Sequence, residues 1–346
     1  LHAFPTRRSS DLETSGLTAV DMFDAVLAGK IKVLWIACTN PAQSMPDQAK
    51  VRAALEKAEF VIVQEAFAHT ETLAYADLIL PAATWPEKDG TVTNSERRIS
   101  RVRAAIKPPG DAKPDWKLVC AIAKKLAAKI APSKAALFNY RDEAAIFAEH
   151  VRFTAGRDLD YGALNYARLE AEGPQQWPYV SARTDSVRLY QDGIFPTDSG
   201  RAQFMDVGYT PVADLVSAQY PLRLTTGRLR DQWHTMNRTG LVPVLTRHEE
   251  EPRLHLHPAD MQRLKIGNDT LVRVKSRRGE IIVPALRDPD LKPGHAFMPM
   301  HWGCAFMGGD GVNALSNSCG YPMSLQPEIR HSGIGIERLN CAWEGS

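Results

Sequence analysis

Short apolar runs alternate with amphipathic segments between residues 17 and 81, and no other feature constrains the fold as strongly. Apolar residues recur at helical spacing in three segments, 17–27, 48–58 and 70–75. Apolar runs follow these segments at 31–37, 60–63 and 76–81. Such runs are typical of strands that are buried on both faces of a parallel sheet. This alternation predicts an α/β doubly wound, Rossmann-like domain.

Polar side chains follow the first two predicted strands. Asn40 lies in a turn closed by Pro41, and Gln64 and Glu65 follow the second strand. Ligands of doubly wound sheets bind beyond the carboxyl ends of the strands, where a carboxylate can accept hydrogen bonds from ribose hydroxyls. An acidic side chain in such a place can equally cap a helix, so both interpretations of Glu65 stay open.

The last third of the chain is rich in β-strand signals. A strand is expected at 220–224, a hairpin at 270–276 and 281–286, a further strand from 294 to 299, and a helix that begins within 254–260 and reaches Leu264. Short strands joined by glycine turns are typical of a β-barrel. Before this region, helices are expected at 116–126 and 138–150, a loop at 161–173, and short strands near 177–178, 187–190 and 200–204.

A basic loop follows the strand at 220–224. Thr225, Thr226 and Gly227 are followed within a dozen residues by three arginines, a tryptophan and a histidine: Arg228, Arg230, Trp233, His234 and Arg238. Backbone N–H groups and guanidinium groups in such a loop can bind an anion such as phosphate. The alternative is a solvated basic surface loop.

Composition excludes several classes of protein. The net charge of +2 gives no electrostatic case for binding nucleic acid or an acidic membrane surface. No apolar run approaches the roughly 18 residues of a membrane-spanning helix. The five cysteines form no C-x-x-C pair, which argues against a disulfide framework, a zinc site or an iron–sulfur site, and we expect buried thiols.

Several separated motifs resemble one family. Thr226-Gly227-Arg228 with Trp233-His234-Thr235 resembles a signature of the prokaryotic molybdopterin oxidoreductases (the dimethyl sulfoxide reductase family), and within it is most similar to the assimilatory nitrate reductases. The same resemblance extends to segments 38–41 (C-T-N-P), 85–98 (with E-K-D-G-T-V-T-N-S-E-R-R), 301–303 (H-W-G), 312–315 (V-N-A-L) and 326–330 (Q-P-E-I-R). Arg330 replaces the family's lysine, and Tyr321 stands where the family has aspartate.

The resemblance implies a set of residues that bind a bis-molybdopterin guanine dinucleotide cofactor with molybdenum. They are Asn40, Gln64, Glu65, Lys88, Asp115, Thr226, Gly227, Arg228, Trp233, His234, Thr235, Asn313 and Arg330. Asp115 would accept hydrogen bonds from guanine, or cap the helix that follows it. Asn313 would contact the pterin, or stabilise a turn. The resemblance implies no catalytic residue and no metal ligand in this chain; His234 is a weak candidate for proton transfer.

The resemblance also implies a domain plan. Residues 1–12 do not join the pattern and resemble an extraneous segment. Residues 13–135 would form the α/β dinucleotide-binding domain, 136–215 a connecting segment, and 216–342 a molybdopterin dinucleotide-binding barrel of the double-psi type with six strands.

The expected function is that of the C-terminal part of a cytoplasmic nitrate reductase, which reduces nitrate to nitrite. The family's four-cysteine motif for a 4Fe-4S cluster and its molybdenum ligand are expected in an N-terminal part, so this portion alone should be inactive. The expected partners are nitrate and an electron donor (ferredoxin, flavodoxin or an NAD(P)H-linked reductase subunit), with no nucleic acid or membrane. The alternatives are a formate dehydrogenase of the same family and a non-catalytic scaffold subunit.

Overall fold

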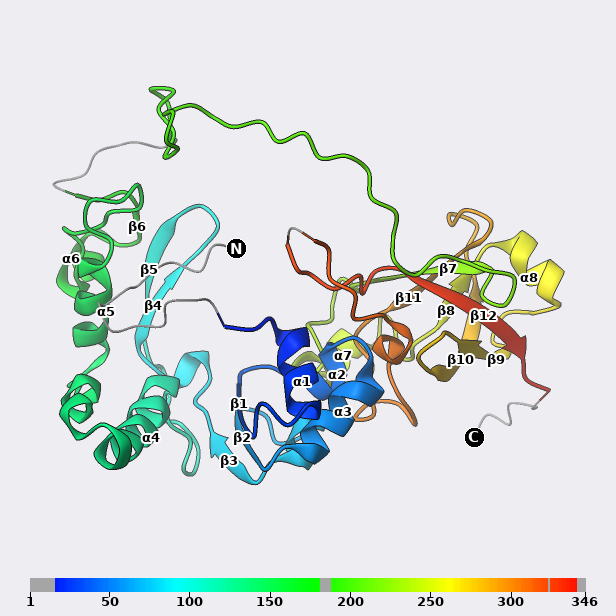
Figure 1. Ribbon diagram of the computed structural model, residues 1–346, viewed down its shortest axis with the longest axis horizontal. Coiled ribbons are helices and arrows are strands. Elements are labelled where there is room, and N and C mark those ends of the chain that lie inside the picture. The colour runs from blue at the N-terminus through cyan, green and yellow to red at the C-terminus, as the bar shows by residue number, and fades with distance from the viewer. Residues whose placement is uncertain (1–15, 181–187, 323, 341–346) are drawn as a thin grey trace. The chain divides into compact units, whose positions relative to one another are not determined.

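The computed structural model describes residues 16–180, 188–322 and 324–340, which divide between two compact units (Figure 1). One unit combines the described residues up to 80 with those from 210 onward, and the other spans 81–209. The segment 1–12 that the sequence set apart lies outside the described residues. The domain boundaries predicted at residues 135 and 215 stay predictions.

The first unit contains the predicted α/β sheet, with strand order β1-β2-β3 and a parallel β1–β2 pair. Its elements are α1 (Ala19–Leu27), β1 (Val33–Ala37), α2 (Pro41–Ser44), α3 (Gln48–Lys57), β2 (Phe60–Glu65), the 3-10 helix η1 (Glu71–Tyr75) and β3 (Leu78–Pro81). The alternation predicted for residues 17–81 is therefore present, and Gln64 and Glu65 are the last two residues of β2.

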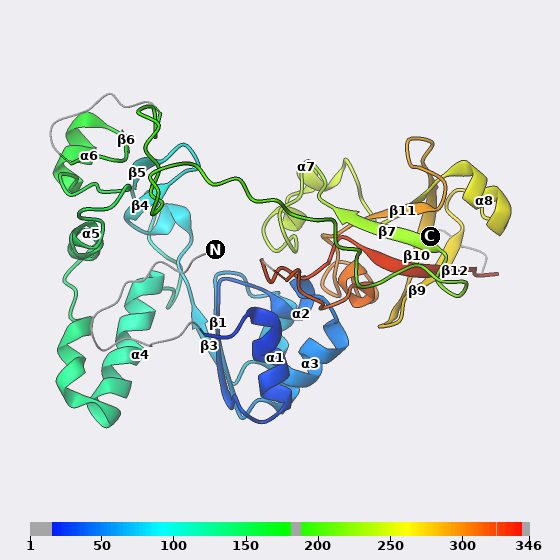
Figure 2. The ribbon, with the colours of Figure 1, turned by 45° about the horizontal axis from the view of Figure 1, so that its top comes forward.

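Helices α1 and α3 lie side by side against one face of this sheet (Figure 2). Their apolar side chains pack on Leu34 and Ile36 of β1 and on Val61 and Val63 of β2. The intervening side chains of β1 point to the other face, where Val33 is 56% exposed within the described structure. The expectation that this strand is buried on both faces is therefore wrong here, because helices of this unit cover only one face.

The same unit contains a closed barrel of six strands in the order β10-β8-β11-β7-β12-β9. Its elements are β7 (Leu222–Gly227), the 3-10 helix η4 (Thr239–Leu241), α7 (Pro243–Thr246), β8 (Leu254–Leu256), α8 (Pro258–Leu264), β9 (Leu271–Lys275), β10 (Glu280–Arg287), β11 (His295–Pro299), the 3-10 helix η5 (Val312–Leu315) and β12 (Ser332–Arg338). The predicted hairpin is the antiparallel β9–β10 pair. The structure thus confirms an α/β sheet and a six-stranded barrel.

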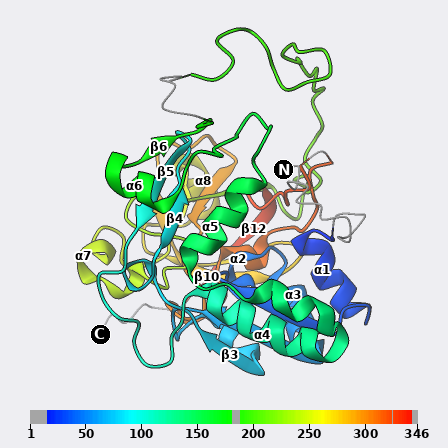
Figure 3. The ribbon, with the colours of Figure 1, turned by 90° about the vertical axis from the view of Figure 1, so that its left-hand side faces the viewer.

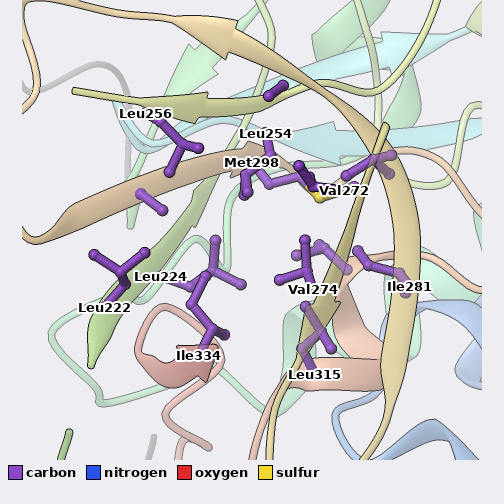
Figure 4. Packing of buried hydrophobic residues seen from close by; sticks show 14 of the residues in the cluster. Leu222, Leu224, Leu254, Leu256, Val272, Val274, Ile281, Met298, Leu315 and Ile334 are labelled. Carbon is purple, nitrogen blue, oxygen red and sulfur yellow. The ribbon is translucent and has the colours of Figure 1, made fainter. Parts of the chain in front are cut away.

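The barrel closes around an apolar core to which every strand contributes. Figure 4 shows Leu222, Leu254, Val272 and Ile334 pointing into one cluster from four different strands. Along β7 and β9 buried and more exposed residues alternate, because successive side chains point to opposite faces. One prediction fails here. Residues 254–256 begin no helix; they form β8, and the helix starts only at Pro258.

The second unit is built on a three-stranded sheet with the order β4-β5-β6. It comprises the 3-10 helix η2 (Trp85–Glu87), β4 (Gly90–Thr93), β5 (Arg98–Val102), α4 (Asp115–Ile130), the 3-10 helix η3 (Pro132–Phe138), α5 (Glu143–Arg152), α6 (Tyr166–Glu172) and β6 (Gln175–Gln176). Ile99 of β5 packs with Phe147 of α5 and Leu169 of α6 in its core, and α6 lies beside the sheet (Figure 3).

Three expectations for this unit need correction. Residues 161–173 are not only a loop, because Asn165 caps α6 by accepting from the Arg168 N–H. Residues 188–190 and 200–204 form turns and irregular backbone instead of strands; residue 187 lies outside the described structure. The strand near 177–178 is found two residues earlier, as β6.

Candidate functional site

Asn40, at the end of β1, uses its whole amide to join separate parts of the first unit. Its Nδ2 donates to Glu71 Oε2 at 2.6 Å and to Thr235 Oγ1 at 3.2 Å. Its Oδ1 accepts from the backbone N–H of Thr72 at 3.1 Å and from the Thr72 hydroxyl at 2.7 Å. Both hydrogens and both lone pairs are therefore engaged within the protein. Asn40 fixes the sheet end to the basic loop of the barrel.

The end of β2 is organised around its own turn. Gln64 is buried, and Glu65 Oε1 accepts from the N–H groups of Ala66 and Phe67 at 2.7 and 3.3 Å. No helix begins at these donors, so the carboxylate stabilises a turn instead of capping a helix.

Residues 228–240, here called the cationic loop, present two arginines around one indole. The guanidinium carbons of Arg228 and Arg238 lie 5.2 and 5.9 Å from the ring centroid of Trp233, within cation–π range. All three side chains are exposed, and within the described residues neither arginine forms an ion pair with a carboxylate. Two guanidinium groups without counter-charges are suited to binding an anionic ligand.

Arg230 of the same loop differs from these two arginines. Its guanidinium forms a two-fold hydrogen bond with the neighbouring Asp231, at 2.9 and 2.8 Å, and it is largely exposed. Its charge is thus compensated by Asp231, so a substitution of Arg230 can serve as the control for substitutions of Arg228 and Arg238.

His234 stands edge-on to Trp233, with ring centroids 4.5 Å apart. Partial desolvation and the positive charges of Arg228 and Arg238 lower the pKa of His234 below its ordinary value. The imidazole is therefore neutral near pH 7, and it can donate one hydrogen bond and accept another. His234 also has a φ of 46°, in the left-handed region that non-glycine residues seldom adopt.

The cationic loop is held by side chains that point inward. The buried Gln232 donates to the Leu245 carbonyl at 3.1 Å and accepts from the Thr239 hydroxyl at 2.7 Å. Just before the loop, Thr226 donates to the carbonyl of Ile329 at 3.1 Å, which ties it to the segment carrying the exposed Arg330. Hydrogen bonds within the protein therefore fix the conformation of the cationic loop.

A second buried contact joins α2 to the barrel. Asn313 Nδ2 donates to the carbonyls of Gln43 and Ser44 at 3.2 and 3.0 Å, and Gln43 Nε2 donates to the carbonyl of Trp302. Asn313 thus holds the two parts of this unit together, a role different from both the predicted pterin contact and the alternative of stabilising a turn. No role was predicted for Gln43 or Glu71, which contact Trp302 and Ala305 respectively, each more than 200 residues away in the chain.

In the second unit, Lys88 and Asp115 form an ion pair with an Nζ–Oδ2 distance of 2.6 Å. Asp115 is the first residue of α4, and the cap position is taken by Pro114, which makes no side-chain cap bond. The capping interpretation of Asp115 is therefore wrong. The structure thus brings together Asn40 with Thr235 and Lys88 with Asp115.

The described residues contain no cluster of three or more His, Cys, Asp or Glu side chains that could hold a metal ion.

Of the cysteines there, Cys120 is buried as expected, but Cys38, Cys304 and Cys319 are exposed; Cys341 lies outside the described part. Among the described helices, none combines the length and apolar character needed to span a membrane.

Two family models match the chain. Residues 3–125 match molybdopterin oxidoreductase, and residues 222–333 match the molybdopterin dinucleotide binding domain. The first match begins inside the segment 1–12. The second covers the cationic loop and nearly the whole barrel.

Relatives among characterised proteins extend over most of the chain. It is 40% identical to a nitrate reductase of Synechocystis sp. over 326 residues, which cover 93% of the chain and 45% of that protein. It is 39% identical to the F420-dependent formate dehydrogenase subunit alpha of Methanocaldococcus jannaschii (94% and 46%), and 32% identical to the assimilatory nitrate reductase catalytic subunit of Bacillus subtilis (90% and 43%). The chain spans less than half the length of each of these relatives.

A solved structure shares the fold. Acetylene hydratase from Pelobacter acetylenicus superposes with a TM-score of 0.70 at 17% identity, over 92% of this chain and 46% of that one. This likeness shows the fold alone. The two matched domains and the relatives above show that the chain belongs to the molybdopterin oxidoreductase family.

Proposed function

We propose that this chain is the dinucleotide-binding part of a molybdenum-dependent nitrate reductase, which reduces nitrate to nitrite. The observation that carries the proposal is the exposed pair Arg228 and Arg238 on Trp233, without carboxylate partners in the described structure, inside the matched dinucleotide-binding domain. A molybdopterin guanine dinucleotide carries phosphates that need such cationic donors.

The donor set of the loop fits this cofactor. Planar guanidinium groups match phosphate oxygens, and the neutral His234 adds a donor and an acceptor for a polar pterin or ribose without further charge. Thr226, Gly227 and Thr235 lie beside these groups and would bring backbone N–H groups to the ligand. We assign Arg330 to the same role, on a segment that Thr226 holds in place.

The remaining predicted residues fall into two groups. The side-chain amides of Asn40 and Asn313 donate their hydrogens to other protein groups, so we assign these two residues a structural role around the site. Lys88 and Asp115 would bind the phosphate and guanine parts after their ion pair opens, and Gln64 and Glu65 would contact the ribose. His234 is not assigned a step in bond breaking.

The proposed overall reaction is NO3− + 2 H+ + 2 e− → NO2− + H2O. When bound, the molybdenum cofactor supplies the two-electron chemistry. This chain would orient the cofactor, neutralise its phosphates and exclude water. The polypeptide corresponding to the part of the relatives that this chain does not span would supply the metal ligand and a 4Fe-4S cluster. We also propose a cytoplasmic location and ferredoxin, flavodoxin or an NAD(P)H-linked subunit as electron donor.

Two finer features of the fold belong to the same proposal. The exposed sheet face at Val33 and Trp35 is apolar, as it would be if helices of the intact protein covered it and made the sheet doubly wound. The six-stranded barrel would be of the double-psi type. The likeness to acetylene hydratase supports the architecture but not the reaction, since one fold hosts different chemistries.

A formate dehydrogenase is the second candidate, because the relative from Methanocaldococcus jannaschii is 39% identical over as much of the chain. The test is to purify the native gene product, measure its molybdenum and its acid-released GMP, and assay both reactions with viologen dyes. Nitrite production from nitrate supports the proposal, whereas formate oxidation supports the second candidate. A protein that holds neither molybdenum nor GMP would be a scaffold, and the proposal would be dropped.

A further inference from the structure

One buried histidine contacts the cationic loop at both ends of its ligand-binding segment. His301 follows β11 and is fully buried. Its Nε2 lies 2.9 Å from the backbone N of Leu229, and its Nδ1 lies 2.6 Å from the backbone O of His234. Arg228 and Trp233 lie next to these two anchored residues. One imidazole therefore spans the segment that carries the exposed guanidinium–indole contact.

The partners determine the tautomer of this ring. The N–H of Leu229 can only donate, so Nε2 must be the acceptor, and the carbonyl of His234 can only accept, so Nδ1 must carry the proton. A protonated imidazolium would direct an N–H against the Leu229 N–H. Both contacts can be made only by the neutral ring protonated at Nδ1.

The bond to His234 also supports a costly backbone conformation. His234 has a φ of 46°, and residues held in this region persist only when their surroundings fix them. The carbonyl of His234 is the very group that accepts from His301. Without that bond, a partly buried acceptor would lose its partner and the left-handed residue would lose a restraint.

The electrostatic surroundings agree with a neutral ring. Desolvation is the largest cause and lowers the pKa of His301. The hydrogen bond to the His234 carbonyl opposes it and raises this pKa, while the positive charge of Arg228 and the imidazole of His234 lower it further. Both of these groups belong to the cationic loop. From the other packed elements, α2 brings the uncharged Gln43 to the neighbouring Trp302, and η1 brings Glu71 to the backbone N–H of Ala305.

We propose that His301 is a positioning residue, which as the neutral Nδ1–H tautomer holds residues 229–234 in the conformation that binds the dinucleotide phosphates. This inference deepens the proposed function and rests on it for the identity of the ligand. It assigns a role to a residue that touches the loop and not the ligand.

The test uses the full chain, with GDP as the probe for the nucleotide part of the cofactor. Nitrogen-15 imidazole spectra report the tautomer of His301, and hydrogen exchange reports the protection of the Leu229 amide. Titration calorimetry reports the affinity for GDP. The variants are His301→Phe, which keeps a ring but removes both hydrogen bonds, and His301→Gln, which can donate and accept. His255→Phe is the control, because His255 lies on β8 with Asp288 as its partner.

We expect an Nδ1–H signature at neutral pH in the wild type. In His301→Phe the Leu229 amide should lose protection and GDP affinity should fall by about tenfold or more, with recovery in His301→Gln and no change in His255→Phe. A ring protonated at Nε2, or a folded His301→Phe that binds GDP like the wild type, would overturn the inference. If the wild type fails to bind GDP, the proposed function is contradicted, while lost Leu229 protection in His301→Phe would still support the positioning role.

Discussion

The amide of Asn40 donates to the hydroxyl of Thr235 across 3.2 Å, and these two residues are 195 positions apart in the chain. Thr235 in turn donates to Asn237 Oδ1 at 3.0 Å. A continuous series of hydrogen bonds therefore runs from the end of β1 into the cationic loop. The α/β sheet and the barrel of this unit are thus joined at the place where the ligand would bind.

Replacing Asn40 by alanine should reduce stability strongly. The change leaves the N–H of the buried Thr72 without its acceptor and removes one of the partners of the Glu71 carboxylate, which should lower the free energy of unfolding by about 2–4 kcal/mol. Urea unfolding measures this. Asn268→Ala is the control, since its exposed side chain accepts one bond, from the Arg287 N–H, and should cost about 1 kcal/mol or less. Equal losses in the two variants would contradict the central role of Asn40.

Gly303 is required by the packing of Gln43. A Cβ atom at this position would lie 2.3 Å from Gln43 Cδ and 2.6 Å from Glu71 Oε1. Gly303→Ala should therefore displace Gln43 from the Trp302 carbonyl and lower the free energy of unfolding by about 1–3 kcal/mol.

Gly308 offers a matched control in the same segment, because a Cβ there meets nothing within 4 Å and its φ is not positive. Thermal unfolding of Gly303→Ala and Gly308→Ala, each against the wild type, measures the difference. Similar melting temperatures for the two variants would mean that the contact between α2 and the barrel is not tightly packed.

Arg228 and Arg230 should differ sharply in their effect on ligand binding. Arg228→Gln removes an uncompensated charge beside Trp233 and should weaken GDP binding by about tenfold. Arg230→Gln removes a charge that Asp231 already compensates, so the affinity should change by less than about twofold. Calorimetric titrations at low and physiological salt check both, and the salt dependence should decrease only in Arg228→Gln. A larger effect of Arg230→Gln would place the anion elsewhere on the loop.

The strands and helices with a clear local pattern could be predicted from the sequence. The parallel pair β1–β2 and the hairpin β9–β10 follow from short apolar runs and from the turn around Gly279. The failure at Leu254–Leu256 has a simple cause. A strand of three residues, placed directly before a helix that begins at a proline, is too short for its alternating pattern to be recognised in the sequence. Leu254 and Leu256 form a strand because both side chains pack into the barrel core.

The residues of the candidate site likewise fall into those that the sequence could predict and those that it could not. Arg228, Trp233 and His234 are recognisable because they lie together in the sequence and have the chemistry of anion binding. Glu71, Gln43 and His301 have no such local signal, since their roles depend on partners far away in the chain. Folding alone brings these groups together, so the sequence identifies the groups that face a ligand better than those that hold them.

Stability should depend on pH through His301. The lowered pKa means that the folded protein binds this proton less readily than the unfolded chain, whose imidazole titrates near about 6.5. The stabilisation is therefore fully present above about pH 6.5 and is lost as the pH falls below it, by at most about 1.4 kcal/mol per pH unit for one proton. His301→Gln has no such group and should lose less stability between pH 7 and pH 5.

Urea unfolding of both proteins at several pH values measures the difference between their stabilities. The carboxylates and His234 are common to both proteins, so the difference reports the contribution of His301 together with its coupling to His234. We expect the wild type to be the more stable protein at pH 7 and its advantage to shrink steadily toward pH 5. Curves that stay parallel over this range would show that His301 binds its proton equally in the folded and unfolded protein, so folding would not favour the neutral ring.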